Sequence, residues 1–260
     1  MSESGNIPML QVEGLAKRFG GIVATDNLSL DVVQGELHAI IGPNGAGKTT
    51  LIAQLSGQLR ADSGRIHFAG DDITALPPHK RSLLGLARSF QITSLFLDLS
   101  VLDNVALAVQ AHAGHSFHFW RDARKDEALR TPARAALERA GLADRAEWPA
   151  ASLSHGEHRQ LELAMALAGQ PRMLLLDEPM AGLGPEESAR MVTMLRALKS
   201  ELTILLVEHD MEAVFALADR ITVLVYGRVI ASGTPDNIRA DAKVREAYLG
   251  ETDKEGAAHV

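Results

Sequence analysis

The alternation of hydrophobic and polar residues divides the chain into segments of strand type and of helix type. Three segments alternate apolar and polar residues, namely Leu10–Glu13, Leu28–Val32 and Arg65–Phe68. This pattern is typical of strands with one buried face. Three other segments are continuously apolar, namely Leu37–Ile41, Met173–Leu176 and Thr203–Val207. They predict strands buried on both faces. We therefore expect an α/β fold in which an antiparallel layer packs beside a parallel core.

Helical patterns dominate the middle of the chain, where Ala, Leu, Arg and Glu become frequent. Val101–Val109 predicts one helix. Pro132–Ala140 predicts another, because Thr131 fits its N-cap, a proline fits its first position and Gly141 fits its C-cap. We expect a helical subdomain, over about residues 92–165, inserted into the α/β core.

The α/β pattern resumes in the last third of the chain. Pro185–Lys199 predicts a helix with proline at its start and glutamates in its first turn, and Asp210 is placed to cap the next helix. The runs Ile221–Val225 and Val229–Ala231 predict a hairpin.

Composition excludes several classes of protein. The chain has 260 residues, a net charge of −7 and no cysteine, so it has neither disulfides nor thiolate metal sites and no sign of general nucleic-acid binding. Its polar N-terminus lacks a signal-peptide core, and no apolar run approaches the length of a membrane span. We expect a chain that does not itself cross a membrane.

The main candidate site is a glycine-rich segment after the predicted strand Leu37–Ile41. It reads Gly42, Pro43, Asn44, Gly45, Ala46, Gly47, Lys48, Thr49 and Thr50. This order fits the P-loop, in which backbone N–H groups and a helix N-terminus hold phosphate groups. Lys48 is expected to reach the β- and γ-phosphates, and the Thr49 hydroxyl to bind Mg²⁺. The segment predicts a nucleotide site.

Two carboxylates follow the predicted strand Met173–Leu176. Asp177 and Glu178 stand at its C-terminal end, which is where parallel α/β sheets place their ligands. In this Walker B arrangement, Asp177 would hold Mg²⁺ directly or through water. Glu178 would act as the general base that orients and deprotonates the attacking water.

A third segment, Leu153 to Glu157, gives a specific resemblance. With the other two motifs, it resembles the order found in the ATP-binding-cassette (ABC) ATPases, whose signature is usually Leu-Ser-Gly-Gly-Gln. Ser154 and Gly156 match this signature, whereas His155 and Glu157 differ. In the family, the matching residues grip the γ-phosphate held by the P-loop of the other subunit. The spacing of Ser154 and Glu157 also fits a capping box, and a cap and an anion site share the same geometry.

Further positions match landmarks of the family. The resemblance implies that Gln91 reaches Mg²⁺ and the attacking water, that His209 senses the γ-phosphate and supports Glu178, and that Phe19 stacks under the adenine. One position departs from the family. Gly184 stands where an aspartate usually bridges the two subunits, which leaves open how tightly the two hydrolysis sites are coupled.

The resemblance covers about residues 8–250, which leaves polar termini at 1–7 and 251–260. It is strongest to the ATP-binding subunits of importers for branched-chain and related amino acids, with some likeness to urea importers. The segments that carry it are Arg88–Gln91, Gln110–Pro132, Ser154–Gly156, Leu161–Ala164, Asp177–Leu183 and Tyr226–Gly233. It implies a P-loop NTPase (RecA-like) core with an antiparallel β subdomain and an inserted α-helical subdomain.

The same resemblance implies cofactors, partners and location. The chain would bind ATP and Mg²⁺ and hydrolyse ATP as a homodimer, or as a heterodimer with a sister ABC ATPase. Transmembrane permease subunits would bind it at the cytoplasmic face of the inner membrane, as a peripheral protein. A periplasmic solute-binding protein would select the solute, which the cassette itself never contacts.

Three alternatives remain open. A lipopolysaccharide-export ATPase shares much of the pattern but has a shorter stretch before its signature. Soluble cassette proteins of translation or DNA repair usually carry two cassettes or a long coiled coil, and this chain has neither. A P-loop kinase for small molecules would lack the signature and the switch histidine.

Two segments suggest contacts with partners. Ile92–Leu99 holds five large apolar residues directly after Gln91. In the family this region forms the groove that receives a short cytoplasmic helix of the transport subunit, although a core segment would have the same pattern. His112, His115 and His118 have helical spacing for a metal site, but no carboxylate completes a set. A loop that faces a partner or folds back on the chain is the other reading.

Overall fold

The antiparallel layer expected from the alternating segments is present. The computed structural model describes residues 8–89, 95–113 and 126–246. The first sheet has the strand order β2–β1–β4–β5. Its strands are β1 (Leu10–Phe19), β2 (Ile22–Val32), β4 (Ser63–Phe68) and β5 (Asp71–Asp72). Leu10 pairs with Val32 of β2 on one side and with Phe68 of β4 on the other, and both pairings are antiparallel.

The second sheet contains the three continuously apolar strands, as expected. Its order is β10–β9–β3–β8–β7–β6. The strands are β3 (Leu37–Ile41), β6 (Leu86–Arg88), β7 (Met173–Asp177), β8 (Thr203–Val207), β9 (Arg220–Val225) and β10 (Arg228–Gly233). All neighbours are parallel except the hairpin β9–β10. Tyr226 and Gly227 form the hairpin turn with positive φ angles of 49° and 77°, which suits a tight two-residue turn.

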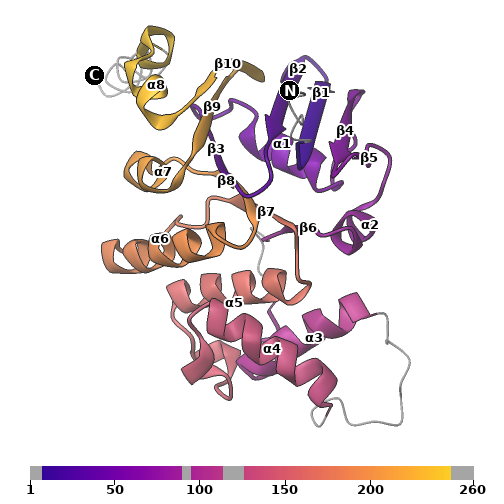
Figure 1. Cartoon of the computed structure of the whole chain (residues 1–260), viewed down its shortest axis with the longest axis vertical. Helices are drawn as coiled ribbons and strands as arrows, with labels where there is room; N and C mark the ends of the chain where they lie inside the picture. Colours follow the sequence, from indigo (N-terminus) through magenta and orange to yellow (C-terminus); the bar gives the residue numbers. More distant parts are fainter. Residues whose placement is uncertain (1–7, 90–94, 114–125, 247–260) are drawn as a thin grey trace, which may run out of the picture.

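Five helices lie against the two sheets (Figure 1). They are α1 (Lys48–Leu55), α2 (Pro78–Leu83), α6 (Pro185–Lys199), α7 (Met211–Leu217) and α8 (Pro235–Ala240). Asp210 caps α7 as predicted, through bonds from the N–H groups of Glu212 and Ala213. Buried Arg81 donates to the carbonyl oxygens of Gln54 and Leu55, both at 2.8 Å. It therefore satisfies the C-terminal end of α1, where a positive charge is favourable.

The remaining helices form a separate layer at the far end of the molecule from the first sheet (Figure 1). They are α3 (Val101–Ala113), α4 (Glu127–Arg139) and α5 (His155–Ala168), with 3₁₀ turns at Ala143–Arg145 and Ala150–Ser152. They share one large apolar cluster with the second sheet and α6.

The prediction that a helix begins at Pro132 was wrong. Helix α4 begins at Glu127, its N-cap is Asp126, and Pro132 lies inside it. Gly141 ends the helix as expected, with a φ of 70°. Its N–H donates to the Glu138 carbonyl oxygen, and the Leu142 N–H donates to that of Leu137, which is a Schellman ending.

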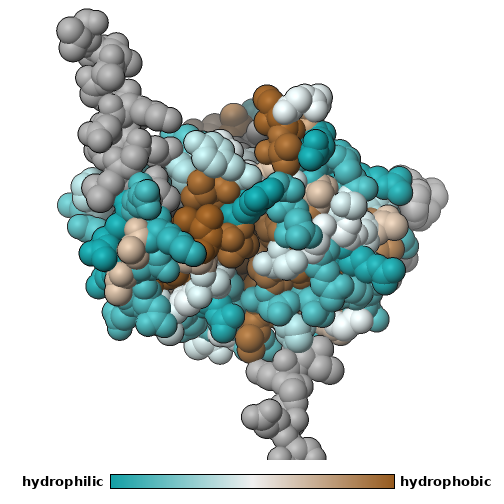
Figure 2. Space-filling model, turned by 90° about the horizontal axis from the view of Figure 1, so that it is seen from above, coloured by the Kyte–Doolittle hydropathy of each residue, from teal (hydrophilic) through white to brown (hydrophobic). Residues whose placement is uncertain are grey.

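Nine large apolar side chains are exposed among the described residues. Viewed from above, hydrophilic residues cover most of the visible face and hydrophobic ones gather near its centre (Figure 2). No helix in the described ranges is both long enough and apolar enough to span a membrane.

Candidate nucleotide site

The P-loop connects β3 to α1 in a conformation that its glycines make possible. Gly42 and Gly47 have positive φ angles of 154° and 101°. A Cβ at Gly42 would lie 2.1 Å from the Leu224 carbonyl oxygen, and one at Gly47 would lie 2.1 Å from that of Ala24. Side chains are therefore excluded at both positions, because the loop packs directly on the backbone of β2 and β9.

Lys48 is buried at the first position of α1. Its ammonium donates to the carbonyl oxygens of Gly42 at 2.6 Å and Pro43 at 3.0 Å. The charge is therefore held over the loop itself. Thr49 follows at the start of the helix, where it is exposed. Backbone N–H groups, a helix N-terminus and an ammonium together suit a phosphate chain.

The strand order brings Asp177 to the edge of the second sheet at which the P-loop begins. Strand β8 lies between β3 and β7, and Val207 of β8 pairs with Ile40 on one side and Asp177 on the other. Burial raises the pKa of Asp177, and the nearby charge of Glu178 adds to this, whereas Arg88 and Lys48 oppose it. The carboxyl ends of three parallel strands therefore gather these charges, as the sequence predicted.

The Asp177 carboxylate is only partly satisfied. Its Oδ2 atom accepts a bond from Arg88 Nη2 at 3.1 Å. Its buried Oδ1 atom has no hydrogen-bond partner among the described residues. An unpaired carboxylate oxygen beside a phosphate-binding loop fits a Mg²⁺ ion or a water of its shell. Thr49 and Asp177 are the described residues that would hold it.

Glu178 has an unusual backbone conformation. Its φ is +51°, which is uncommon for a residue with a side chain. Its N–H donates to the Val207 carbonyl oxygen at 2.8 Å, and its carbonyl accepts from Ala181 at 3.1 Å. The half-buried side chain is therefore aimed by a fixed turn at the end of β7, and such local strain is frequent at functional sites.

His209 follows β8, and its side chain is 64% exposed. Its Nδ1 atom lies 3.7 Å from Glu208 Oε2. Glu208 itself is completely buried. Its carboxylate accepts N–H bonds from Met180 at 2.9 Å, from His209 at 3.0 Å and from Asp210 at 3.4 Å. The turn after Glu178 and the turn that carries His209 are therefore held by one carboxylate.

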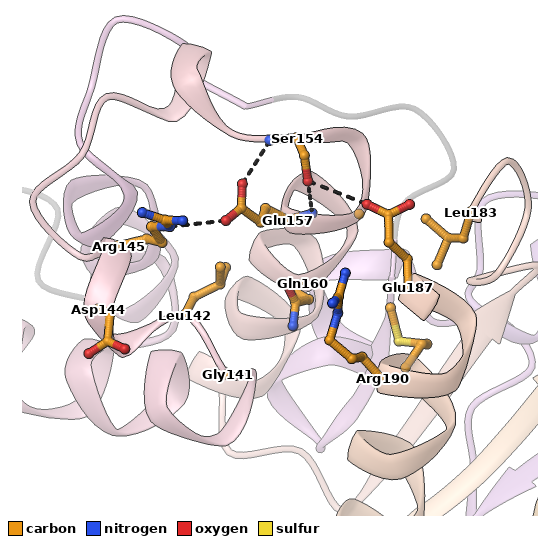
Figure 3. Close-up of a pocket in the computed structure, with 12 residues that line it drawn as sticks. Gly141, Leu142, Asp144, Arg145, Ser154, Glu157, Gln160, Leu183, Glu187 and Arg190 are labelled. Carbon is orange, nitrogen blue, oxygen red and sulfur yellow. Dashed lines mark hydrogen bonds and ion pairs between the residues drawn. The ribbon is translucent and has the colours of Figure 1, made fainter. Parts of the chain in front are cut away.

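The signature segment forms the capping box expected at the start of α5 (Figure 3). Ser154 Oγ accepts from the Glu157 N–H at 3.2 Å, and Glu157 accepts from the Ser154 N–H at 2.8 Å. Arg145 donates to the same carboxylate at 3.0 Å. The Ser154 N–H first and Arg145 second hold the pKa of Glu157 below its usual range. Glu157, which differs from the family's glutamine, therefore has a structural role here.

Ser154 faces a cleft of about 690 Å³ between α5 and α6 (Figure 3). Glu187 projects into it from α6: one oxygen lies 3.5 Å from Ser154 Oγ, and the other accepts from the Gly184 N–H at 3.2 Å. A Cβ at Gly156 would lie 2.5 Å from Glu187. The Glu187 carboxylate thus lies beside Ser154 and Gly156, the two residues that the sequence predicted to bind a phosphate.

The predicted residues form two groups. Lys48, Thr49, Asp177 and Glu178 share one edge of the second sheet, whereas Ser154 and Gly156 start α5 in the helical layer (Figure 1). Phe19 is 49% exposed at the end of β1, in the hairpin whose Ala24 packs on the P-loop. Gln91 lies outside the described residues.

Some predictions concern groups that the structure describes only in part. His115 and His118 lie outside the described residues. His112 Nε2 lies 2.8 Å from Ser82 Oγ, and its Nδ1 lies 3.0 Å from the Ala108 carbonyl oxygen. The described residues contain no group of three metal-ligating side chains that could hold an ion.

Sequence reasoning missed three charged residues of the site, namely Arg88, Glu187 and Glu208. Arg88 and Glu208 were visible only as neighbours of Gln91 and His209. Glu187 was assigned to the first turn of a helix, and nothing local in the sequence places it against Ser154.

The P-loop, the Walker B carboxylates and the separate signature helix together define an ATP-binding cassette. The family model of ABC transporters matches residues 25–181, and the model described as "Branched-chain amino acid ATP-binding cassette transporter" matches residues 228–254. The chain belongs to this family of ABC transporter ATP-binding subunits, in its branched-chain amino acid group, and it is an ATPase.

Curated relatives and solved structures agree over almost the whole chain. The high-affinity branched-chain amino acid transport ATP-binding protein BraF of Pseudomonas aeruginosa is 38% identical, over 94% of this chain and 98% of its own. The high-affinity branched-chain amino acid transport ATP-binding protein LivG of Escherichia coli K12 is equally similar, with 38% identity over 94% of this chain and 98% of its own. The crystal structure of an ABC transporter cassette in its ADP conformation superposes with a TM-score of 0.83 at 32% identity, over 94% of this chain and 99% of its own.

Proposed function

We propose that this chain powers the uptake of branched-chain or related amino acids through membrane subunits. The observation that carries the proposal is the match of the branched-chain family model to residues 228–254, together with relatives whose names describe transport of these amino acids. Lipopolysaccharide export and soluble, non-transport cassettes lack such support. The test is uptake of leucine, isoleucine and valine, and of neutral amides, by cells with and without an intact copy of this chain.

In the proposed reaction, Lys48 and the P-loop N–H groups bind the phosphates, while Phe19 stacks on the adenine. Mg²⁺, held by Thr49, Asp177 and Gln91, would neutralise phosphate charge when bound. Glu178 orients a water in line with the γ-phosphate and removes its proton. His209 senses the γ-phosphate from the next strand end.

Two copies, or this chain and a sister ATPase, are proposed to close over two ATP molecules. The motivation is that the P-loop leads into α1, whereas Ser154 is the N-cap of α5, and these two helices lie in separate parts of the molecule (Figure 1). A solved dimeric cassette with bound ADP and phosphate superposes with a TM-score of 0.74 at 25% identity. Each ATP would lie between Lys48 of one copy and Ser154 of the other, and hydrolysis would let the dimer open.

The proposed base has a direct test. Glu178→Gln keeps the shape of the side chain but removes the base, so ATP binding should persist while turnover falls on the order of 100-fold or more. Nucleotide titration and phosphate release measure the two quantities. Hydrolysis near the wild-type rate in this variant would exclude Glu178 as the base.

The membrane partners are proposed to bind at a groove of about 300 Å³ between the second sheet and the helical layer. Apolar residues, including Leu86, Leu95 and Met165, make most of its wall, and Arg88 lines it as well. Phe96, beside Leu95, is 57% exposed. A short apolar helix of a permease fits such a surface. The chain would then act as a peripheral protein at the cytoplasmic face of the inner membrane, and a periplasmic binding protein would deliver the solute.

Phe96 allows a test that leaves the core intact. Its N–H and carbonyl group are bonded to the Asn104 side chain at 2.9 and 3.0 Å, so the segment is fixed without the exposed ring. Phe96→Asp should keep the ATPase rate of the isolated chain but abolish uptake. Trp148→Asp, at an exposed aromatic position of the helical layer that neither lines the groove nor adjoins a lining residue, is the control. Wild-type uptake with Phe96→Asp would rule out this surface.

A further inference from the structure

The completely buried carboxylate of Glu208 makes three backbone hydrogen bonds to two different turns. Its Oε1 atom accepts from the Met180 N–H at 2.9 Å. Its Oε2 atom accepts from the N–H groups of His209 at 3.0 Å and Asp210 at 3.4 Å. Met180 is two residues after the proposed base, and His209 is the proposed phosphate sensor. One side chain therefore joins the turns that carry both.

A cap for the following helix does not account for this arrangement. The first N–H groups of α7, at Glu212 and Ala213, are satisfied by the Asp210 side chain at 3.0 and 3.1 Å. Burial of a carboxylate is costly unless several donors compensate for the lost water. The bond from the Met180 N–H joins Glu208 to the neighbouring strand-end turn, 28 residues away in the sequence.

The base is held on both sides by the end of β8. Before the turn, the Glu178 N–H donates to the Val207 carbonyl oxygen at 2.8 Å. After the turn, Met180 donates to Glu208. Glu178 lies between these two bonds with its φ of +51°. The bonds of Glu208 therefore form one continuous connection from the His209 backbone to the turn of Glu178.

We propose that Glu208 is a positioning residue for ATP hydrolysis, which holds Glu178 and His209 in one geometry. The proposal rests on the proposed roles of those two residues. Among the described residues, Glu208 has no hydrogen bond to a P-loop side chain, and its bond to β3 is a long one, from its own N–H to the Ile40 carbonyl oxygen at 3.5 Å. Loss of the carboxylate should therefore reduce the rate of hydrolysis and leave ATP affinity unchanged.

The first test compares Glu208→Gln with the wild type. The amide keeps the size of the side chain, but its NH₂ group faces a backbone N–H where an acceptor is needed. We expect kcat to fall on the order of 10-fold or more, with KM and the dissociation constant of ATP within about 2-fold, because only an interaction specific to the transition state is lost.

A matched control is available at the opposite end of the same sheet. The Asp219 carboxylate accepts from the Leu37 N–H at 2.9 Å and pairs with Lys199. Asp219→Asn makes the same chemical change to a carboxylate that binds backbone, far from the site. It should reduce the melting temperature without changing kcat. If Glu208→Gln does not fold, Glu208→Asp keeps the charge but is one methylene too short to reach both turns, and it should show the same selective loss of kcat.

The decisive readout is the double variant Glu178→Gln/Glu208→Gln. Residues that act as one unit lose activity non-additively, so the double variant should be no slower than Glu178→Gln alone. The role of Glu208 would be overturned if the loss of kcat in the double variant equalled the product of the losses in the two single variants. A Glu208→Gln kcat within 2-fold of the wild type would overturn it as well. Normal hydrolysis by Glu178→Gln would instead overturn the proposed base, so the two failures are distinguishable.

Discussion

Removal of Arg88 should show how strongly Asp177, the carboxylate proposed to hold Mg²⁺, depends on one buried ion pair. The side chains of Arg88 and Asp177 are 9% and 0% exposed, and Nη2 lies 3.1 Å from Oδ2. Arg88→Met leaves Asp177 buried beside Glu178 without its cation. Breaking a buried pair by removing one partner typically costs about 3–5 kcal/mol of folding free energy.

Arg88 also makes contacts that have nothing to do with Asp177. Its Nη1 atom donates to Gln58 Oε1 at 2.5 Å and to Ser56 Oγ at 3.3 Å. A double-mutant cycle separates these from the ion pair, because they are lost equally in both backgrounds. In the Asp177→Asn background no charge is left unpaired, so Arg88→Met should cost no more than about 1–2 kcal/mol, the range for ordinary hydrogen bonds.

The assay is urea unfolding of the four proteins at neutral pH, with the slope m compared to confirm that all four unfold alike. We expect a coupling energy of at least about 2 kcal/mol between the two positions, near the upper part of the range for residues in contact. Equal costs of Arg88→Met in both backgrounds would refute the reasoning, because Arg88 would then stabilise the fold through Ser56 and Gln58 alone.

Three further outcomes are expected. Lys48→Ala removes the ammonium held over the P-loop and should weaken ATP binding at least about 10-fold, measured by nucleotide titration; an unchanged dissociation constant would exclude the P-loop as the site. With ATP, Glu178→Gln should form a dimer by light scattering and Glu178→Gln/Ser154→Arg should remain a monomer; a Glu178→Gln monomer would favour a sister ATPase as the partner. Because the pKa of Glu157 is lowered in the folded state, its contribution to stability is present above the unfolded pKa near 4.5 and is lost as the pH falls below it. The stability difference between wild type and Glu157→Gln should therefore decrease as the pH of the unfolding experiment is lowered from 7 to below 4.5, and a difference independent of pH would contradict this.

The parts of the site that could be predicted from the sequence are those whose residues are close together along the chain. The P-loop, Asp177 and Glu178, and the Ser154 capping box each lie in one continuous segment, and the required conformations follow from neighbouring residues. The side chains that were missed act across the fold. Arg88 and Asp177 are 89 positions apart in the sequence, and Ser154 and Glu187 are 33 apart, so only the strand order and helix packing bring them together.

The start of α4 shows how packing overrides a local signal. Thr131 and Pro132 look like a helix start, yet the helix extends one and a half turns before them. Leu129 is buried in the main cluster, and Arg130 pairs with Asp103 of α3 at 3.0 Å. These contacts offset the loss of one helical bond at Pro132, and neither can be read from the segment itself.

Arg88 contacts both the nucleotide site and the groove proposed for the membrane partner. It lines the groove assigned to the membrane partner, and it bonds Asp177 at the nucleotide site. A helix that fills the groove therefore lies one residue away from the carboxylate proposed to hold Mg²⁺. Interactions of a buried charge are strong because little water screens them, so a small displacement of the guanidinium changes the field at Asp177 directly. Arg88 is therefore the described residue through which an occupant of the groove would change the electrostatic field at Asp177.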